Sequence, residues 1–448
     1  MTTRWAVVGA GSAGCVVAAR LVDGGADVTL IEAGPALRRN HVPPAIAGLD
    51  FFEAMVEPGR VEPDLVAVRV QGGEPHPYVR GRGEGGSSAV NAMVALAGTD
   101  AWRTPLGDYS SWRHAEARVA VPIEEPSDDQ LGAVDRALLA AAPDARRAPL
   151  TQRAGRRVTS AEAYLWPRLE RDGIRLVTDT TVDRVLFRGM TAAGLRLADG
   201  SDIEADRIVL CAGAIHTPAI LLRSGVESSE LGRGLTDHPS ASLVLDLVPE
   251  ARSDAGRLAA GALVERDGCQ VLSVNHLDGG ASGLGSLLAA LLRPVGRRGR
   301  VSLDPHRPSD PLAAPVVEFD LVGDPHDLAG LIAAAGMAID MAREPSVAAI
   351  CTDVYVDAFG TTIDDLLAGG DEAMARWLRS GAGDYVHAAG TCAIGSVTAA
   401  DGRVVGRDAL FVCDASLFPV IPDANTHLPT TMLAELLVER WELAGMMA

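Results

Sequence analysis

The chain of 448 residues contains no lysine, so all 40 of its basic residues are arginine. This excludes an enzyme that forms a Schiff base on lysine, and a P-loop that needs its lysine at the phosphates. With 59 acidic residues the net charge is −19, and such a chain repels nucleic acids and anionic membrane surfaces. We therefore expect neither of these as a partner.

Cysteine is also scarce. The six cysteines form no C-x-x-C motif and no paired spacing, and most lie in apolar stretches. This pattern is typical of buried thiols in a reducing compartment rather than of a disulfide framework. No group of histidine, cysteine and acidic residues has the spacing of metal ligands, so we expect no metal.

Long apolar runs are missing as well. The chain has no run of about 18 apolar residues, and its start has no charged segment followed by an apolar one. We therefore expect a cytoplasmic protein without a membrane span. The chain also lacks the G-x-S-x-G motif of a Ser-His-Asp hydrolase. Its length suggests two lobes, and its composition, 48% hydrophobic and 22% charged, is typical of a globular protein.

The first informative segment, residues 5–32, has the pattern of a strand, a glycine-rich turn, a helix and a second strand. Gly9 permits a tight turn, Gly11 lets the backbone approach a pyrophosphate, and Gly14 lets the helix pack closely on the strand. Glu32 can accept a hydrogen bond from a ribose hydroxyl and would repel the 2′-phosphate of NADP. The motif predicts a dinucleotide site without separating NAD from FAD.

Three later segments narrow the choice of cofactor: YVRGRGEGGSSAVNAMVA at 78–95, RIVLCAGAIHTPAILLRSGV at 207–226 and LFVCDASLFPVIPDANTHLPTTMLAELLVERW at 410–441. In the first, glycines leave room for a flat ring or a phosphate against the backbone, and Ser87 and Asn91 supply hydrogen bonds. The second has the pattern of a buried strand, a glycine turn and a helix, and the third that of a strand, a proline-containing loop and a helix.

Together with VHAAGTC at 386–392, these segments resemble the signatures of the glucose–methanol–choline (GMC) family of flavin oxidoreductases. SAEAYLWP at 160–167 and LLRPVGRRGRVSL at 291–303 are similar to intermediate stretches of that family. The resemblance covers the first hundred residues and most of the chain from about residue 155. It implies FAD as the cofactor and oxidation of an alcohol as the activity.

The chain departs from the family pattern at a few places. The segment 100–155 is abbreviated, Glu84 stands where an aliphatic residue is usual, and Ala388 replaces the common proline after the active-site histidine. Some members attach the flavin covalently through a histidine just before the motif asparagine. Val90 holds that place here, so the resemblance implies non-covalent FAD.

The catalytic residues implied by the resemblance are His387 and Asn425. The family's histidine stands in an H-x-x-G-T element, and its partner lies eleven residues after the aspartate of D-[AG]-S, which is Asp414 here. A neutral imidazole suits removal of the hydroxyl proton, flavin N5 accepts the hydride, and Asn425 can hold the developing alkoxide. His427 is expected to face the flavin or to be structural, and His238 to be a packed loop residue rather than a second base.

His216 is expected near the FAD without a role in the chemistry. The glycine motif and the resemblance together predict these cofactor contacts: Gly9, Gly11, Ser12, Ala13, Gly14, Glu32, Ala33, Gly81, Gly85, Gly86, Ser87, Asn91, Ala92, Met93, Val94, Val182, Ala212, Asp414, Ala415, Asn425 and Thr426.

The expected fold class is α/β, with a discontinuous Rossmann-like FAD-binding domain and a second α+β substrate domain built on an antiparallel sheet. We assign 1–40, 76–105, 155–240 and 380–448 to the first domain, and 41–75, 106–154 and 241–379 to the second. Residues 182–210 have the pattern of a hairpin region that turns at Asp199-Gly200 and leads into a buried strand, and residues 324–344 that of an amphipathic helix.

Several functions stay open from the sequence. An alcohol oxidase passes electrons to O₂, whereas a dehydrogenase passes them to a quinone or to another redox carrier such as a mycofactocin-type partner. A flavin-containing lyase, an NAD-linked dehydrogenase and a non-catalytic flavoprotein are the alternatives. The substrate is a small molecule, and because only 4% of the residues are aromatic, we favour an aliphatic or small alcohol over a sugar. The oligomeric state is not predicted.

Overall fold

The computed structural model describes residues 2–169, 173–253 and 256–447. Its first sheet is five-stranded, parallel throughout, and ordered β21 (Leu410–Val412), β12 (Arg207–Leu210), β1 (Arg4–Val8), β2 (Asp27–Ile31) and β8 (Ile174–Val177). The helix α1 (Ser12–Asp23) connects β1 to β2. A parallel sheet is covered on both faces, which explains why these strands read as continuous apolar runs.

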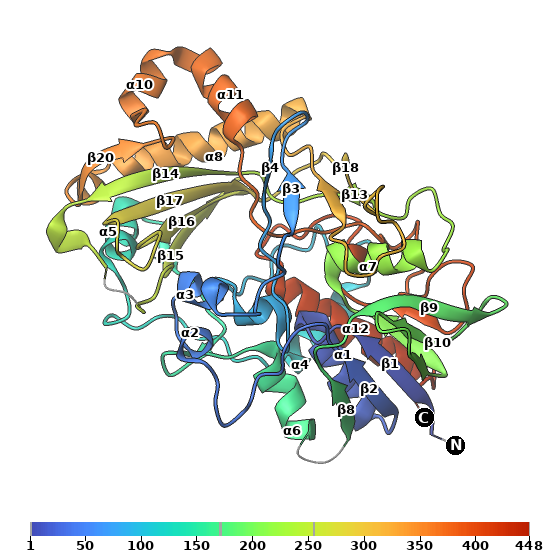
Figure 1. Cartoon of the computed structure of the whole chain (residues 1–448). Helices are drawn as coiled ribbons and strands as arrows, with labels where there is room; N and C mark the ends of the chain where they lie inside the picture. Colours follow the sequence, from blue (N-terminus) through green and yellow to red (C-terminus); the bar gives the residue numbers. More distant parts are fainter. Residues whose placement is uncertain (1, 170–172, 254–255, 448) are drawn as a thin grey trace.

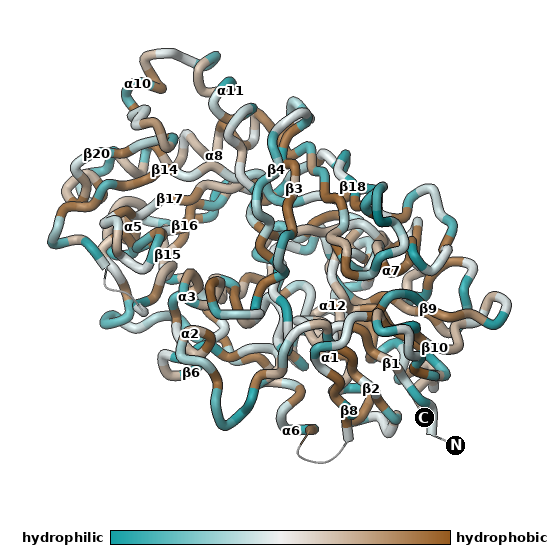
Figure 2. The backbone as a smooth tube through the Cα atoms, viewed as in Figure 1, coloured by the Kyte–Doolittle hydropathy of each residue, from teal (hydrophilic) through white to brown (hydrophobic). Residues whose placement is uncertain are grey.

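One face of this sheet is covered by α1 and by α12 (His427–Leu443), which pack against each other, and α4 (Tyr109–Arg118) packs on α12. Most residues of α12 are buried, so it is a core helix rather than an amphipathic surface helix. Figure 1 shows the red α12 beside the blue α1, and Figure 2 shows β1 and β2 coloured mainly as hydrophobic.

A small antiparallel sheet, ordered β11 (Asp202–Glu204), β10 (Thr191–Leu197) and β9 (Val182–Arg188), packs on α7 (Gly213–Arg223) through β9. Its β10–β11 turn contains Asp199 and Gly200, and Gly200 has a φ of +87°, which favours glycine. The hairpin region that the sequence predicts is therefore confirmed.

The second large sheet is antiparallel and six-stranded, ordered β20 (Cys351–Tyr355), β14 (Ser240–Leu247), β17 (Leu284–Leu291), β16 (Cys269–Val274), β15 (Ala262–Arg266) and β5 (Arg146–Arg147). The helix α8 (Pro325–Arg343) covers one of its faces, as Figure 1 shows. Asp324 caps α8 by accepting a hydrogen bond from the backbone N–H of His326, as expected for a helix over 324–344.

A further five-stranded sheet joins distant parts of the chain in the order β13 (Arg233–Leu235), β18 (Gly299–Ser302), β19 (Val316–Glu318), β3 (Val66–Val68) and β4 (Pro75–Pro77). The other elements are α2 (Pro44–Ala47), α3 (Phe51–Val56), η1 (Gly86–Ala89), α5 (Ala133–Ala141), β6 (Gln152–Arg153), β7 (Arg156–Arg157), η2 (Ala161–Leu165), α6 (Trp166–Leu169), η3 (Pro249–Ala251), α9 (Pro345–Ala348), α10 (Ile363–Ala368), α11 (Gly370–Gly381) and η4 (Ala415–Leu417).

The expected fold class, a Rossmann-like part joined to a part built on an antiparallel sheet, is confirmed. The assignment of 1–40, 76–105, 155–240 and 380–448 to one domain stays a prediction. In the described ranges, the structure has no helix with the length and apolar character needed to cross a bilayer.

Candidate active site

A cavity of about 380 Å³ lies where the carboxyl ends of the parallel strands meet the second large sheet. Val8 and Gly9 border it at the end of β1, and Glu32 borders it just after β2. Cys211 and Asp414 do so just after β12 and β21. Ligands of open α/β sheets bind at this edge, so the topology itself points to the cavity as the site.

Two glycine-rich loops form the floor of the cavity at the start of α1. A Cβ added at Gly14 would lie 1.8 Å from the carbonyl oxygen of Gly9, so only glycine lets this helix approach the turn. A Cβ added at Gly86 would lie 2.6 Å from the Cα of Gly11. The two backbones therefore touch, and the N-terminus of α1, which borders the cavity at Gly11 and Ser12, leaves room for a diphosphate.

The carboxylate of Glu32 is fixed at the end of β2. Its two oxygens accept hydrogen bonds from the backbone N–H groups of Ala10 (2.7 Å), Gly34 (2.9 Å) and Gly83 (2.9 Å). It is buried, yet it borders the cavity. A carboxylate held in this way can accept from a ribose hydroxyl and repels a phosphate at the same place.

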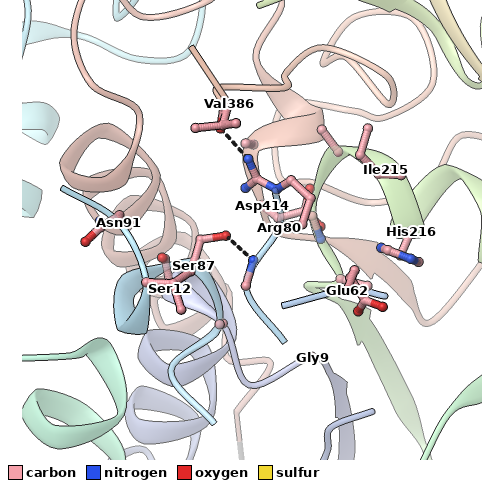
Figure 3. Close-up of a pocket in the computed structure, with 18 of the residues that line it drawn as sticks. Gly9, Ser12, Glu62, Arg80, Ser87, Asn91, Ile215, His216, Val386 and Asp414 are labelled. Atoms are coloured by element: carbon pink, nitrogen blue, oxygen red, sulfur yellow. Dashed lines mark hydrogen bonds between the residues drawn. The ribbon is translucent and has the colours of Figure 1, made fainter. Parts of the chain in front are cut away.

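The loop after β4 presents Ser87 and Asn91 to the cavity. Ser87 Oγ accepts from the backbone N–H of Gly81 at 3.1 Å, and Figure 3 shows this contact close to Ser12. Asn91 Oδ1 accepts from the backbone N–H of Met93, which has a φ of +64°, and from Arg157. The loop is therefore held in place by hydrogen bonds within the protein.

The N-terminus of α12 also lies at the cavity, with Thr426 and His427 in its lining. His427 Nδ1 is 3.0 Å from Ser12 Oγ, whereas its buried Nε2 has no hydrogen-bond partner. Burial lowers the pKa of His427 to about 4, and the charge of Arg157 adds to the effect. An unpartnered buried nitrogen beside a helix N-terminus suits a polar, electron-rich ligand.

The residues that border the cavity fit FAD. The loops meeting at Gly11 and Gly86 leave room for its diphosphate, Glu32 suits its ribose, and the nitrogen of His427 together with the start of α12 suits the polar edge of its ring.

At the other end of the cavity, His387 contacts His238 through their Nδ1 atoms, 2.9 Å apart. His238 Nε2 lies 3.0 Å from the carbonyl oxygen of Pro422. A carbonyl only accepts, so this nitrogen carries the proton of neutral His238, whose pKa is lowered to about 4 by burial. His238 Nδ1 is then an acceptor, and His387 donates its Nδ1–H to it.

The Nε2 of His387 is therefore left with its lone pair. Burial, followed by the neighbouring His238 and Arg80, lowers the pKa of His387 well below the usual value for histidine. His387 borders the cavity as a neutral imidazole whose unprotonated nitrogen is set by the His238 contact.

Asp237 holds the backbone on both sides of this histidine pair. Its carboxylate accepts from the backbone N–H of His387 (3.0 Å to each oxygen), from that of His238 (2.7 Å) and from the hydroxyl of Tyr78 (2.7 Å). Burial raises the pKa of Asp237 to about 7, with the charge of Asp384 as the next cause. Asp237, His238 and His387 lie close enough to resemble a metal-ligand set, but hydrogen bonds already occupy the carboxylate of Asp237 and the Nδ1 atoms of both histidines.

The carboxamide of Asn425 is oriented from the second sheet. The hydroxyl of Tyr385 donates to Gln270 Oε1 at 2.8 Å, and Gln270 Nε2 donates to Asn425 Oδ1 at 3.4 Å. The amide nitrogen of Asn425 faces the Tyr385 hydroxyl as a hydrogen-bond donor, and Asn425 borders the cavity. The ring centroids of Tyr385 and His387 are 4.9 Å apart, so Tyr385 and His387 lie at the same end of the cavity.

The cavity brings together all but two of the residues that the sequence predicts as its contacts. Gly14 and Gly85 do not border it. Gly14 packs behind the turn at Gly9, on the side away from the cavity. Gly85 lies in the other glycine-rich loop with a φ of +94°, and its backbone N–H donates to the carbonyl oxygen of Ala10. His216 borders the cavity, and burial lowers its pKa to about 4. His238 is fully buried in a loop as expected, but its direct contact with His387 was not predicted.

The sequence does not identify Gln270 and Tyr385 as residues of the site. A glutamine within the apolar CQVLSV run, and a tyrosine two residues before His387, were the available signals for them.

Comparison with known proteins agrees with this geometry. Family models described as GMC oxidoreductase match residues 145–240 and 294–434, together more than half of the chain. The chain is 28% identical to a 5-(hydroxymethyl)furfural oxidase of Methylovorus sp. strain MP688, over 97% of this chain and 98% of the relative.

Solved structures share the fold. A pyridoxine 4-oxidase from Mesorbium loti superposes with a TM-score of 0.84 at 23% identity, covering 98% of this chain and 99% of its own. A formate oxidase of Aspergillus oryzae RIB40, studied for its FAD modification, gives a TM-score of 0.85 at 16% identity, with 99% of both chains covered. With the matched family models and a cavity that fits FAD, these comparisons show that the chain belongs to the GMC oxidoreductase family.

Proposed function

We propose that the protein oxidises an alcohol to the carbonyl compound, with His387 as the base and Asn425 as the hydrogen-bond donor to the substrate oxygen. The observation that carries the proposal is the His387–His238–Pro422 chain of contacts, which gives His387 a free lone pair beside the cavity. Relatives with the names 5-(hydroxymethyl)furfural oxidase and pyridoxine 4-oxidase support this reaction class.

His387 and Asn425 have separate roles in this reaction. Oxidation of a CH–OH group removes the hydroxyl proton and a hydride from the same carbon, and bound FAD supplies the acceptor for the hydride. Nε2 of His387 takes the proton, because it is unprotonated near neutral pH. The amide of Asn425 donates to the oxygen as negative charge develops on it, and Gln270 prevents the carboxamide from turning its oxygen toward that charge.

Both catalytic assignments are tested by anaerobic stopped-flow reduction of the flavin. His387→Gln should slow the reduction by about 10²–10⁴-fold because the general base is lost. Asn425→Ala should slow it by about 10²–10³-fold because one donor to the alkoxide is lost. Both variants should keep the flavin spectrum. His306→Gln, at an exposed position, is the control and should react like the wild type.

Reduction of wild-type flavin by alcohols, followed by admission of air, also separates the remaining functions. Rapid reoxidation by air indicates an oxidase, and slow reoxidation indicates a dehydrogenase that uses a quinone or a redox carrier. Flavin that is bound but that no alcohol reduces would favour a lyase and contradict our proposal.

We further propose that the FAD is held without a covalent bond, because Val90 stands where a covalently attached histidine would be needed. Acid precipitation of the holoprotein should release all of the yellow flavin into the supernatant. Flavin that stays with the precipitated protein, detected as an increase in its intact mass, would contradict this prediction.

A further inference from the structure

The strand β16 places an apolar wall next to the catalytic end of the cavity. Side chains of a strand alternate between its two faces, so Gln270, Leu272 and Val274 share one face. Gln270 hydrogen-bonds Asn425 from this face, and Leu272 and Val274 border the cavity beyond it. The opposite face carries Val271, which packs in the core beneath α8.

The neighbouring strand β17 continues the wall. Leu288 lies directly opposite Leu272 in the antiparallel register, and it borders the cavity as well. Its sequence neighbours Leu287 and Ala289 point to the other face and pack with the helix-covered core. One face of the sheet therefore supports α8, and the other presents aliphatic side chains to the cavity.

The helix α3 supplies apolar groups from a second direction. Phe51 and Met55, one helical turn apart, border the cavity and are partly buried. Asp50, which caps this helix, lies near the end of β16: its carboxylate is 3.4 Å from His276 Nε2, and both side chains are buried. Figure 1 shows α3 beneath the sheet, on the side away from α8.

Most charged side chains of the cavity have an ion-pair or backbone partner within the protein. Asp384 pairs with Arg69 at 2.5 Å, Arg223 with Asp183 at 3.2 Å, and Glu62 with Arg82 at 3.7 Å. Arg80 donates to the carbonyl oxygen of Val386, as Figure 3 shows. Glu32 and Asp414 accept from backbone N–H groups. The wall of Leu272, Val274, Leu288, Phe51 and Met55 offers no polar side chain, so a charged or many-hydroxyl group lying against it would lose water without gaining partners.

We propose that the substrate is an uncharged alcohol with an apolar skeleton, aryl or alkyl. Its carbon skeleton lies against Leu272, Val274, Leu288, Phe51 and Met55, and its hydroxyl group meets His387 and Asn425. This inference rests on the proposed alcohol oxidation and names its substrate class, with the selecting residues placed on β16, β17 and α3.

The test uses the holoenzyme and four alcohols: benzyl alcohol, 4-(hydroxymethyl)benzoate as an anion, choline as a cation, and glucose. Benzyl alcohol should reduce the flavin anaerobically with a second-order rate constant at least about 100-fold above that of each of the others. Choline, glucose or the benzoate reacting as fast as benzyl alcohol would overturn the substrate class and leave the alcohol oxidation intact. Flavin that neither this panel nor an apolar alkyl alcohol reduces would contradict both proposals.

A single substitution in the wall tests whether these side chains select the substrate. Leu288→Glu places a carboxylate on the wall at a partly exposed position, and it should shift the preference between choline and benzyl alcohol by at least about 10-fold toward choline. Leu443→Glu, on an 82% exposed residue at the end of α12, is the matched control. Flavin content and melting temperature check that both variants fold. An unchanged preference in folded Leu288→Glu would show that this wall does not select the substrate.

Discussion

At the residue scale, the role of His387 is set by the groups behind it rather than by its own sequence neighbours. The small residues that flank His387 in the sequence do not separate a catalytic histidine from a structural one. Only the contact with His238, itself fixed by the carbonyl oxygen of Pro422, decides which ring nitrogen carries the proton. We therefore regard His238 as a positioning residue.

His238→Leu should slow flavin reduction by about 10–100-fold, because the tautomer of His387 is no longer fixed. Burial and the neighbouring His238 both lower the pKa of His387. A base works only above its pKa, so the rate falls as the pH drops through that value. Loss of His238 raises the pKa and should move this acid limb to higher pH, as a pH profile of flavin reduction will show.

Two further variants give the controls for this prediction. His238→Asn can still accept from His387 and donate to Pro422, so it should recover much of the rate. His216→Leu removes another histidine of the cavity, which is partly buried, and its acid limb should stay at the wild-type pH. An unshifted acid limb in His238→Leu would contradict the positioning role.

The residue roles could be predicted only where a motif carries them. The glycine pattern and the spacing of His387 and Asn425 are readable in the sequence because local backbone geometry demands those residue types. Gln270 and His238 are not readable in the same way: their partners lie 155 and 149 residues away along the chain. Such contacts depend on how the two large sheets meet, which no local pattern encodes.

At the element scale, the turn between β1 and α1 depends on the absence of side chains. Gly14→Ala would force a Cβ to within 1.8 Å of the carbonyl oxygen of Gly9, so the helix or the turn must move. We expect a loss of about 1–3 kcal/mol in the free energy of unfolding, and weaker FAD binding. Chemical denaturation and flavin content measure the two effects.

Gly336→Ala is the matched control within α8, since an added Cβ there meets no atom within 4 Å. This substitution should instead stabilise the protein by about 0.5–1 kcal/mol, because alanine loses less conformational freedom in a helix. Equal effects of the two substitutions would show that the close approach at Gly14 is not needed.

At the scale of the whole molecule, the parallel sheet and the antiparallel sheet were predictable as classes, but their assembly was not. Hydrophobic runs and turn residues reveal strands, yet they do not say which strands pair. The parallel pairing of β3 with β19 joins residues near 67 to residues near 317. Long-range pairs of this kind follow from the packing of the complete chain.

Because the cavity is bordered by segments from the whole length of the chain, its occupant should stabilise the entire fold. Free FAD at about 100 times its dissociation constant should stabilise the apoprotein by about 2.7 kcal/mol. NADP⁺ at the same concentration should raise the melting temperature little, because Glu32 repels its 2′-phosphate. Differential scanning fluorimetry of the apoprotein measures both, and a larger rise with NADP⁺ would contradict the assignment of the cavity.

The central claim is that His387 removes a proton from an alcohol bound beside flavin. The most direct test is anaerobic reduction of the bound flavin by benzyl alcohol, in the wild type and in His387→Gln, followed at the visible flavin bands. Our account predicts that the wild type bleaches and that the variant keeps its flavin but bleaches about 10²–10⁴-fold more slowly. Equal rates in the two proteins, or a wild type that no alcohol bleaches, would contradict it.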